Sequence, residues 1–122
     1  MLNLNSIMIG ANNSKTLSKF YSQVLGKEPG WSEGDWFGFE VGSCSLMIGP
    51  HSEVVGQNKE PGRIMLHIEA DEPQIEFDRI KALGTKVIRE LENAMPDQEF
   101  KLGTFADPEG NYFQIASVWT EK

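Results

Sequence analysis

Residues 105–115 read FADPEGNYFQI and place a tight turn directly before an alternating strand. Three residues supply the chemistry of the turn. Asp107 can accept hydrogen bonds from the backbone ahead of it, Pro108 fixes φ, and Gly110 permits a positive φ. We therefore expect the chain to reverse between residues 107 and 110 and to enter a strand at once.

The strand after this turn has two unlike faces. Phe113 and Ile115 lie on one face, because successive side chains of a strand point to opposite sides. Tyr112, Gln114 and Ala116 lie on the other. The first face is predicted to pack into a core, which leaves Gln114 on a polar or open surface.

The pattern of the first half of the chain is repeated in the second. Each half begins with an alternating segment, continues with a helical stripe that ends at a glycine, and closes with three short alternating segments. The expected strands are 2–10, 27–34 (a loop or a short edge strand), 36–41, 44–48, 64–70, 86–91, 100–105 and 112–118. The first helix is expected to begin near Asn13 and to end at Gly26, and the second to follow an Asp71 N-cap and to end at Gly84. The pattern predicts an α+β fold with two tandem βαβββ modules.

We predict one domain over residues 1–122, with a first module at 1–50, a linker at 51–62 and a second module at 63–122. The linker is polar and contains Gly56, Pro61 and Gly62. A chain of 122 residues is of the ordinary size for one folded domain.

Two motifs in this pattern resemble the vicinal oxygen chelate superfamily, which includes glyoxalase I, extradiol dioxygenases, fosfomycin resistance enzymes and bleomycin resistance proteins. DPEGNYFQI resembles the closing motif DP-[DE]-GN-x-x-E-L of that superfamily, and FYSQVLG at Phe20–Gly26 resembles its FY-x-x-x-LG helix end. The resemblance covers essentially the whole chain. It implies a mixed sheet curled around a cavity, and modules that pair across a homodimer.

Composition excludes several classes of partner. The 11 basic and 18 acidic residues give a formal net charge of −7 and a pI near 4.8. This balance argues against nucleic acid and against an anionic membrane. Cys44 is the single cysteine, so no disulfide framework is possible. The sequence has neither a basic leader nor a long apolar run, and we expect a cytoplasmic protein.

The resemblance implies metal-ligand positions, and here they carry unusual residues. Ser6, Met65 and Gln114 fall where the metalloenzymes of the superfamily have His or Glu, and Met47 or Ser45 falls at the fourth position. These side chains are neutral, and thioethers favour softer metals. We predict no zinc, iron, manganese or nickel at this position and no cofactor.

His67 leaves one alternative open. It lies on the same face as Met65, about 6–7 Å further along the strand. A register shift of two residues would therefore bring His67 to the metal position, with Glu69 beside it. We favour a hydrogen-bonded lining residue over a ligand, because a single His would leave such a site short of donors.

The remaining prediction concerns a ligand. The expected inward face is rich in methionine and sparsely polar, which suits a small organic molecule. Trp36, with Glu40 nearby, could hold a flat or cationic group, whereas Trp31 and Trp119 are expected at an edge or an interface. The predicted ligand-binding residues are Ser6, Met8, Trp36, Met47, Met65, His67, Tyr112 and Gln114.

We predict a metal-independent small-molecule-binding protein that sequesters a drug or a metabolite. Its functional resemblance is to the bleomycin resistance proteins, so bleomycin is the first ligand to consider. One alternative is a glyoxalase- or dioxygenase-like enzyme with a displaced metal site near His67 and Glu69. Another is an accessory domain whose cleft meets a partner protein.

Overall fold

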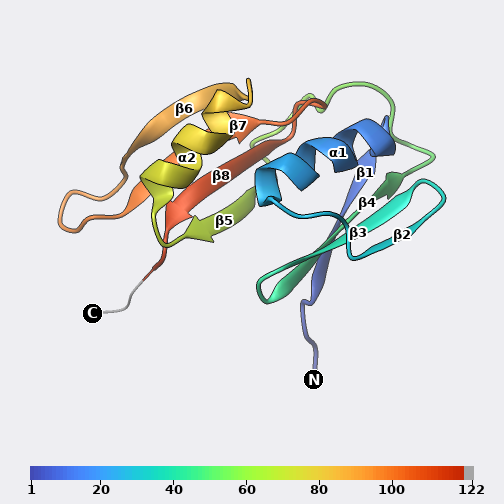
Figure 1. The fold of residues 1–122 in the computed structure, drawn as a ribbon, viewed down its shortest axis with the longest axis horizontal. Helices are drawn as coiled ribbons and strands as arrows, with labels where there is room; N and C mark the ends of the chain where they lie inside the picture. Colours follow the sequence, from blue (N-terminus) through green and yellow to red (C-terminus); the bar gives the residue numbers. More distant parts are fainter. Residues whose placement is uncertain (120–122) are drawn as a thin grey trace. The chain divides into compact units, whose positions relative to one another are not determined.

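The computed structural model describes residues 1–119 and contains the order βαβββ twice (Figure 1). The chain separates into two units, residues 1–57 and the chain from residue 58 onward, and each unit contains one copy. The predicted α+β fold with two βαβββ modules is confirmed. Neither helix within residues 1–119 has the length and hydropathy that a membrane crossing requires.

The first unit contains a four-stranded mixed sheet, called sheet 1 below, and one helix. Its elements are β1 (Ser6–Ala11), α1 (Ser14–Leu25), β2 (Trp31–Glu33), β3 (Trp36–Val41) and β4 (Cys44–Pro50). The strand order is β1-β4-β3-β2, in which β1 runs parallel to β4 and the other pairs are antiparallel. Segment 27–34 therefore contributes a short edge strand, which was one of its two predicted forms.

Local sequence explains both ends of α1. The side chain of Asn13 accepts a hydrogen bond from the backbone N–H of Thr16 at 3.1 Å, and Gly26 ends the helix with a left-handed φ of 70°. The helix covers one face of sheet 1 in Figure 1. Its buried stripe consists of Leu17, Tyr21 and Val24, and the sheet contributes Phe39, Leu46 and Ile48.

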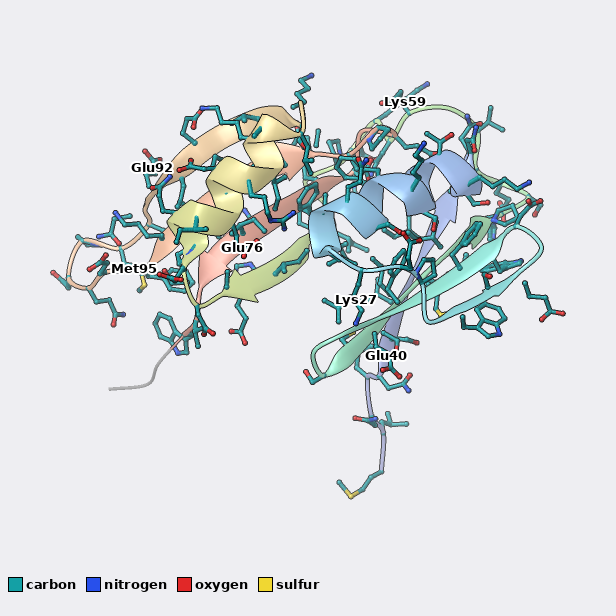
Figure 2. The ribbon with its side chains drawn as sticks, viewed as in Figure 1. Lys27, Glu40, Lys59, Glu76, Glu92 and Met95 are labelled. Carbon is teal, nitrogen blue, oxygen red and sulfur yellow. The ribbon has the colours of Figure 1, made fainter. Side chains whose placement is uncertain are left out.

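Lys27 ties the end of this helix to the sheet. Its Nζ donates a hydrogen bond of 2.7 Å to the backbone carbonyl of Glu40 on β3 (Figure 2). The contact occupies the carbonyl of Glu40 and leaves its carboxylate exposed.

The second unit repeats this arrangement with sheet 2. Its elements are β5 (Leu66–Ala70), α2 (Pro73–Ala82), β6 (Lys86–Asn93), β7 (Lys101–Ala106) and β8 (Tyr112–Ser117). The strand order is β5-β8-β7-β6, with β5 parallel to β8. Each strand pair of sheet 1 thus has a counterpart in sheet 2, and β4 corresponds to β8.

Three aromatic rings form the core of the second unit. Phe77 of α2 stacks on Phe105 with ring centroids 4.3 Å apart, and Phe105 stacks on Phe113 at 5.4 Å. A Cβ on Gly103 would overlap the ring of Phe77. The absence of a side chain on β7 at that position therefore lets α2 seat its aromatic residue against the sheet.

The turn between β7 and β8 is closed by the carboxylate of Asp107. Its Oδ1 accepts hydrogen bonds from the backbone N–H groups of Glu109 at 2.9 Å and Asn111 at 3.0 Å. The Asn111 side chain adds a bond of 3.0 Å to Oδ2, and Gly110 has a φ of 83°. Asn58 bonds both the carbonyl of Glu109 and the side chain of Asn111, which holds the start of the second unit to the turn.

Several predicted boundaries are wrong, and three concern where an element begins or is capped. The first strand begins at Ser6 rather than at residue 2, since Leu2 and Leu4 are exposed and outside the ladder with β4. The fifth strand begins at Leu66 rather than at residue 64, because its partner β8 begins only after the turn. The N-cap of α2 is Glu72 and not Asp71, and Pro73 follows it in the first turn as expected.

The buried turn predicts a large difference between two aspartates. Replacing Asp107, a residue only 5% exposed, by Ala removes the hydrogen bonds that its carboxylate accepts from Glu109 and Asn111, and the free energy of unfolding should fall by about 2–4 kcal/mol. Asp71→Ala is the matched control and should change it by less than about 0.5 kcal/mol. Urea unfolding followed by circular dichroism measures both variants. Equal losses in the two would contradict this account of the turn.

Candidate functional site

Each sheet has one face that its own helix does not cover. On sheet 1 this helix-free face carries alternate residues of β1, β4 and β3, because the intervening residues point toward α1. The predicted residues Ser6, Met8, Trp36 and Met47 all lie on it. Met8 and Met47 are register partners across the parallel pair.

Glycines form the floor of the helix-free face of sheet 1. A Cβ on Gly49 would overlap the indole of Trp36, so that ring lies directly over the β4 backbone. A Cβ on Gly38 would lie 3.1 Å from Sδ of Met47 and 3.4 Å from the indole of Trp31. The indoles of Trp36 and Trp31 and the thioether of Met47 therefore lie over glycine positions of β4 and β3.

This face is apolar and partly exposed, and acidic side chains lie at its border. Met8 and Trp31 each retain 46% exposure, and Trp36 is half-buried. Glu33 is the register partner of Trp36, and Glu40 is the partner of Ser45. Indole rings with a carboxylate nearby offer both stacking and cation–π attraction to a flat cationic group.

A loop covers the end of the same face. A Cβ on Gly10 would lie 3.0 Å from Cβ of His51 and 3.2 Å from Cγ2 of Val54. The loop is held by a hydrogen bond of 3.1 Å from the backbone N–H of Gly56 to the side chain of Asn12. The segment after β4, predicted as a linker, thus also limits one end of this surface.

The helix-free face of sheet 2 carries a row of hydrogen-bonded polar side chains. Gln114 of β8 lies between His67 of β5 and Thr104 of β7, and both are its register partners. The distance from His67 Nδ1 to Gln114 Oε1 is 3.2 Å, and Gln114 Nε2 donates to Thr104 Oγ1 at 3.2 Å. His67 is exposed, whereas Thr104 is 6% exposed.

The register places His67, and not Met65, beside Gln114. The pairing of β5 with β8 starts at Leu66 opposite Phe113, so Met65 precedes the strand. Met65 was the residue predicted at the metal-ligand position, with His67 as the alternative, and in the structure His67 is the register partner of Gln114. His67 is hydrogen-bonded, as expected for that residue.

Comparison with known proteins gives the family. A model of the glyoxalase-like domain matches residues 6–116. The chain belongs to this family. Among curated protein sequences, no match is found.

Solved structures share the fold of this glyoxalase-like protein. A glyoxalase/bleomycin resistance protein/dioxygenase family enzyme from Burkholderia phytofirmans PsJN is 20% identical, with a TM-score of 0.75 over 97% of this chain and 100% of the other. A glyoxalase-related enzyme from Fulvimarina pelagi is 19% identical, with a TM-score of 0.76 over 100% and 94%. A glyoxalase/bleomycin resistance protein from Catenulispora acidiphila DSM 44928 is 15% identical, with a TM-score of 0.68 over 94% and 96%. At these identities the likeness shows the fold alone.

The donor groups of this glyoxalase-like protein do not fit a divalent metal. No group of three or more His, Cys, Asp or Glu side chains within residues 1–119 could hold a metal ion. On sheet 2, His67 and Glu69 supply only two such groups, and the amide of Gln114 already bonds both neighbours. The corresponding pair on sheet 1 is Met8 and Met47, whose thioethers favour soft metals.

The eight predicted residues fall into two sets of four. Three of the second set, His67, Tyr112 and Gln114, share the helix-free face of sheet 2, and Met65 lies just before β5. Trp31 lies on the edge strand β2, one of its two predicted positions, and its ring lies over Gly38 of the neighbouring strand. Thr104 was not predicted as a site residue. The alternation of β7 points its side chain to the sheet face away from that of its core neighbour Phe105.

The contact between Gly49 and the Trp36 ring can be tested by substitution of Gly49. An Ala at this position must displace the Trp36 ring, so we expect a loss of about 1–3 kcal/mol in the free energy of unfolding and a changed near-ultraviolet circular dichroism spectrum. Gly30→Ala is the control, since a Cβ there meets nothing within 4 Å. An unchanged spectrum for Gly49→Ala would show that Trp36 does not rest on this backbone.

Proposed function

We propose that this glyoxalase-like protein binds a small organic molecule without a metal ion and sequesters it, acting as a homodimer. The observation that carries the proposal is the helix-free face of sheet 1. Two indole rings and the thioether of Met47 lie there over glycines, Met8 is the register partner of Met47, and all four side chains remain partly accessible.

The composition of this face indicates the class of ligand. Indole rings offer flat apolar area at a low entropic cost, and methionine adapts its shape to an irregular partner. Glu33 and Glu40 add negative charge at the border, and the whole chain has a net charge of −7. A flat ligand with a positive charge fits these features best.

Sheet 2 supports the metal-independent part of the proposal. A divalent ion prefers carboxylate, imidazole or thiolate donors, and charge on the ligands offsets the charge of the ion. The position beside His67 carries a neutral amide whose oxygen and nitrogen are both engaged. Binding therefore relies on stacking, apolar contact and hydrogen bonds.

Bleomycin is the first probe, because some proteins that share this fold are described as bleomycin resistance proteins. We expect metal-free bleomycin to bind chelator-treated protein in titration calorimetry. Trp36→Ala should weaken binding by about tenfold, since an aromatic contact is removed along with its buried area. Trp119→Ala is the control, because Trp119 packs edge-to-face on Phe100 near the end of β8.

Native mass spectrometry of protein purified from its own host completes the test. We expect two subunits, a retained organic molecule and no stoichiometric metal. Absence of heat with bleomycin excludes that drug. Stoichiometric divalent metal would overturn metal independence, and a protein that retains no molecule and binds no probe would overturn the binding function.

A further inference from the structure

The hydrogen bonds around Gln114 determine which nitrogen of His67 carries the proton. Gln114 Nε2 donates to Thr104 Oγ1, so the amide oxygen faces His67. An amide oxygen only accepts hydrogen bonds, and the ring nitrogen 3.2 Å away must therefore be the donor. In a neutral imidazole that donates from Nδ1, the lone pair lies on Nε2.

Thr104 is the hydrogen-bond partner of the Gln114 amide on the neighbouring strand. It lies on β7 opposite Gln114, and its side chain is almost fully buried. A strand position with a packed β-branched side chain has few rotamers. The amide of Gln114 thus has a defined partner on one side, and the nitrogen that donates to Thr104 leaves the amide oxygen toward His67.

We propose that Nε2 of His67 is a hydrogen-bond acceptor that selects ligands bearing an ammonium N–H group. This inference rests on the proposed small-molecule binding and names the functional group that sheet 2 recognises. His67 is exposed, so a ligand can reach its free nitrogen. Glu69 lies two residues along the same strand face, about 6–7 Å away, and its carboxylate favours a cation there.

Nitrogen-15 NMR of the imidazole tests the tautomer directly, at about pH 8 where a reference imidazole is neutral. We expect the Nδ1–H form in the unmodified protein. Gln114→Glu retains an oxygen acceptor and should preserve it, whereas Gln114→Met removes the acceptor and should allow the Nε2–H form. Thr104→Val removes the group that orients the amide and should give a mixture. A predominant Nε2–H form in the unmodified protein would overturn the proposal.

Two probes with the same ring and the same charge test recognition of the N–H group. Benzylammonium has three N–H donors, and benzyltrimethylammonium has none. We expect benzylammonium to bind roughly threefold to tenfold more tightly, as one hydrogen bond predicts, and to shift the Nε2 resonance of His67. Equal affinity of the two probes, or no shift at Nε2, would contradict the proposal.

Two variants separate the acceptor from the charge. His67→Phe keeps a ring but lacks the acceptor, and it should abolish the preference for benzylammonium. Glu69→Gln should weaken both probes by a similar factor and preserve the preference. If His67→Phe leaves the preference intact, His67 is not the recognising group.

The outcome is distinguishable from the outcome of the proposed function. Binding at the helix-free face of sheet 1 is reported by Trp36→Ala in the bleomycin titration, and recognition on sheet 2 by the probe pair and the His67 resonance. If bleomycin binds, but the two probes bind equally and the Nε2 resonance of His67 does not shift, only this inference is overturned. A His67 response to benzylammonium, with no bleomycin heat and no retained molecule, would leave this inference standing and would overturn ligand binding at the helix-free face of sheet 1.

Discussion

The carboxylate of Asp107 is the contact on which the second unit depends. It occupies the backbone donors of a five-residue turn, so the chain can reverse there without leaving buried N–H groups unbonded. The turn fixes the register between β7 and β8 and thereby sets Thr104 opposite Gln114. Because β5 pairs with β8, the same register brings His67 to Gln114. The hydrogen-bonded row of His67, Gln114 and Thr104 on sheet 2 therefore depends on the turn that the Asp107 carboxylate closes.

Glycines have the corresponding part in positioning apolar groups. On sheet 1, Gly49 and Gly38 leave the backbone bare, and indole rings lie in the space. On sheet 2, Gly103 serves the opposite face and receives Phe77 from the helix. In both repeats a glycine makes room for an aromatic ring. In the first repeat the ring lies on the helix-free face, and in the second it packs in the core under the helix. This divergence explains how similar modules acquire unlike faces.

Much of the fold could be predicted because its signals are local. The glycine that ends α1, the turn at Asp107 and the alternation of β8 each depend on residues close in sequence. The site was less accessible, since it depends on pairing between distant strands. Met65 was predicted at the metal-ligand position with His67 as the alternative, whereas the ladder that starts with Leu66 opposite Phe113 pairs His67 with Gln114. Trp31 lies on the edge strand β2, as one of its predicted positions had it, but only the tertiary structure shows that its ring lies over Gly38.

The difference between an amide and a carboxylate at residue 114 has a chemical consequence. A carboxylate beside His67 would add a negative charge and a second oxygen acceptor, the kind of donor set that a divalent ion requires. The amide is neutral, and its nitrogen needs an acceptor, which Thr104 supplies on the neighbouring strand. With the amide oxygen toward His67, the proposed Nδ1–H tautomer turns the lone pair of Nε2 outward. A face of this kind attracts a hydrogen-bond donor rather than a bare cation, so one residue type separates ligand recognition from metal chemistry on the same framework.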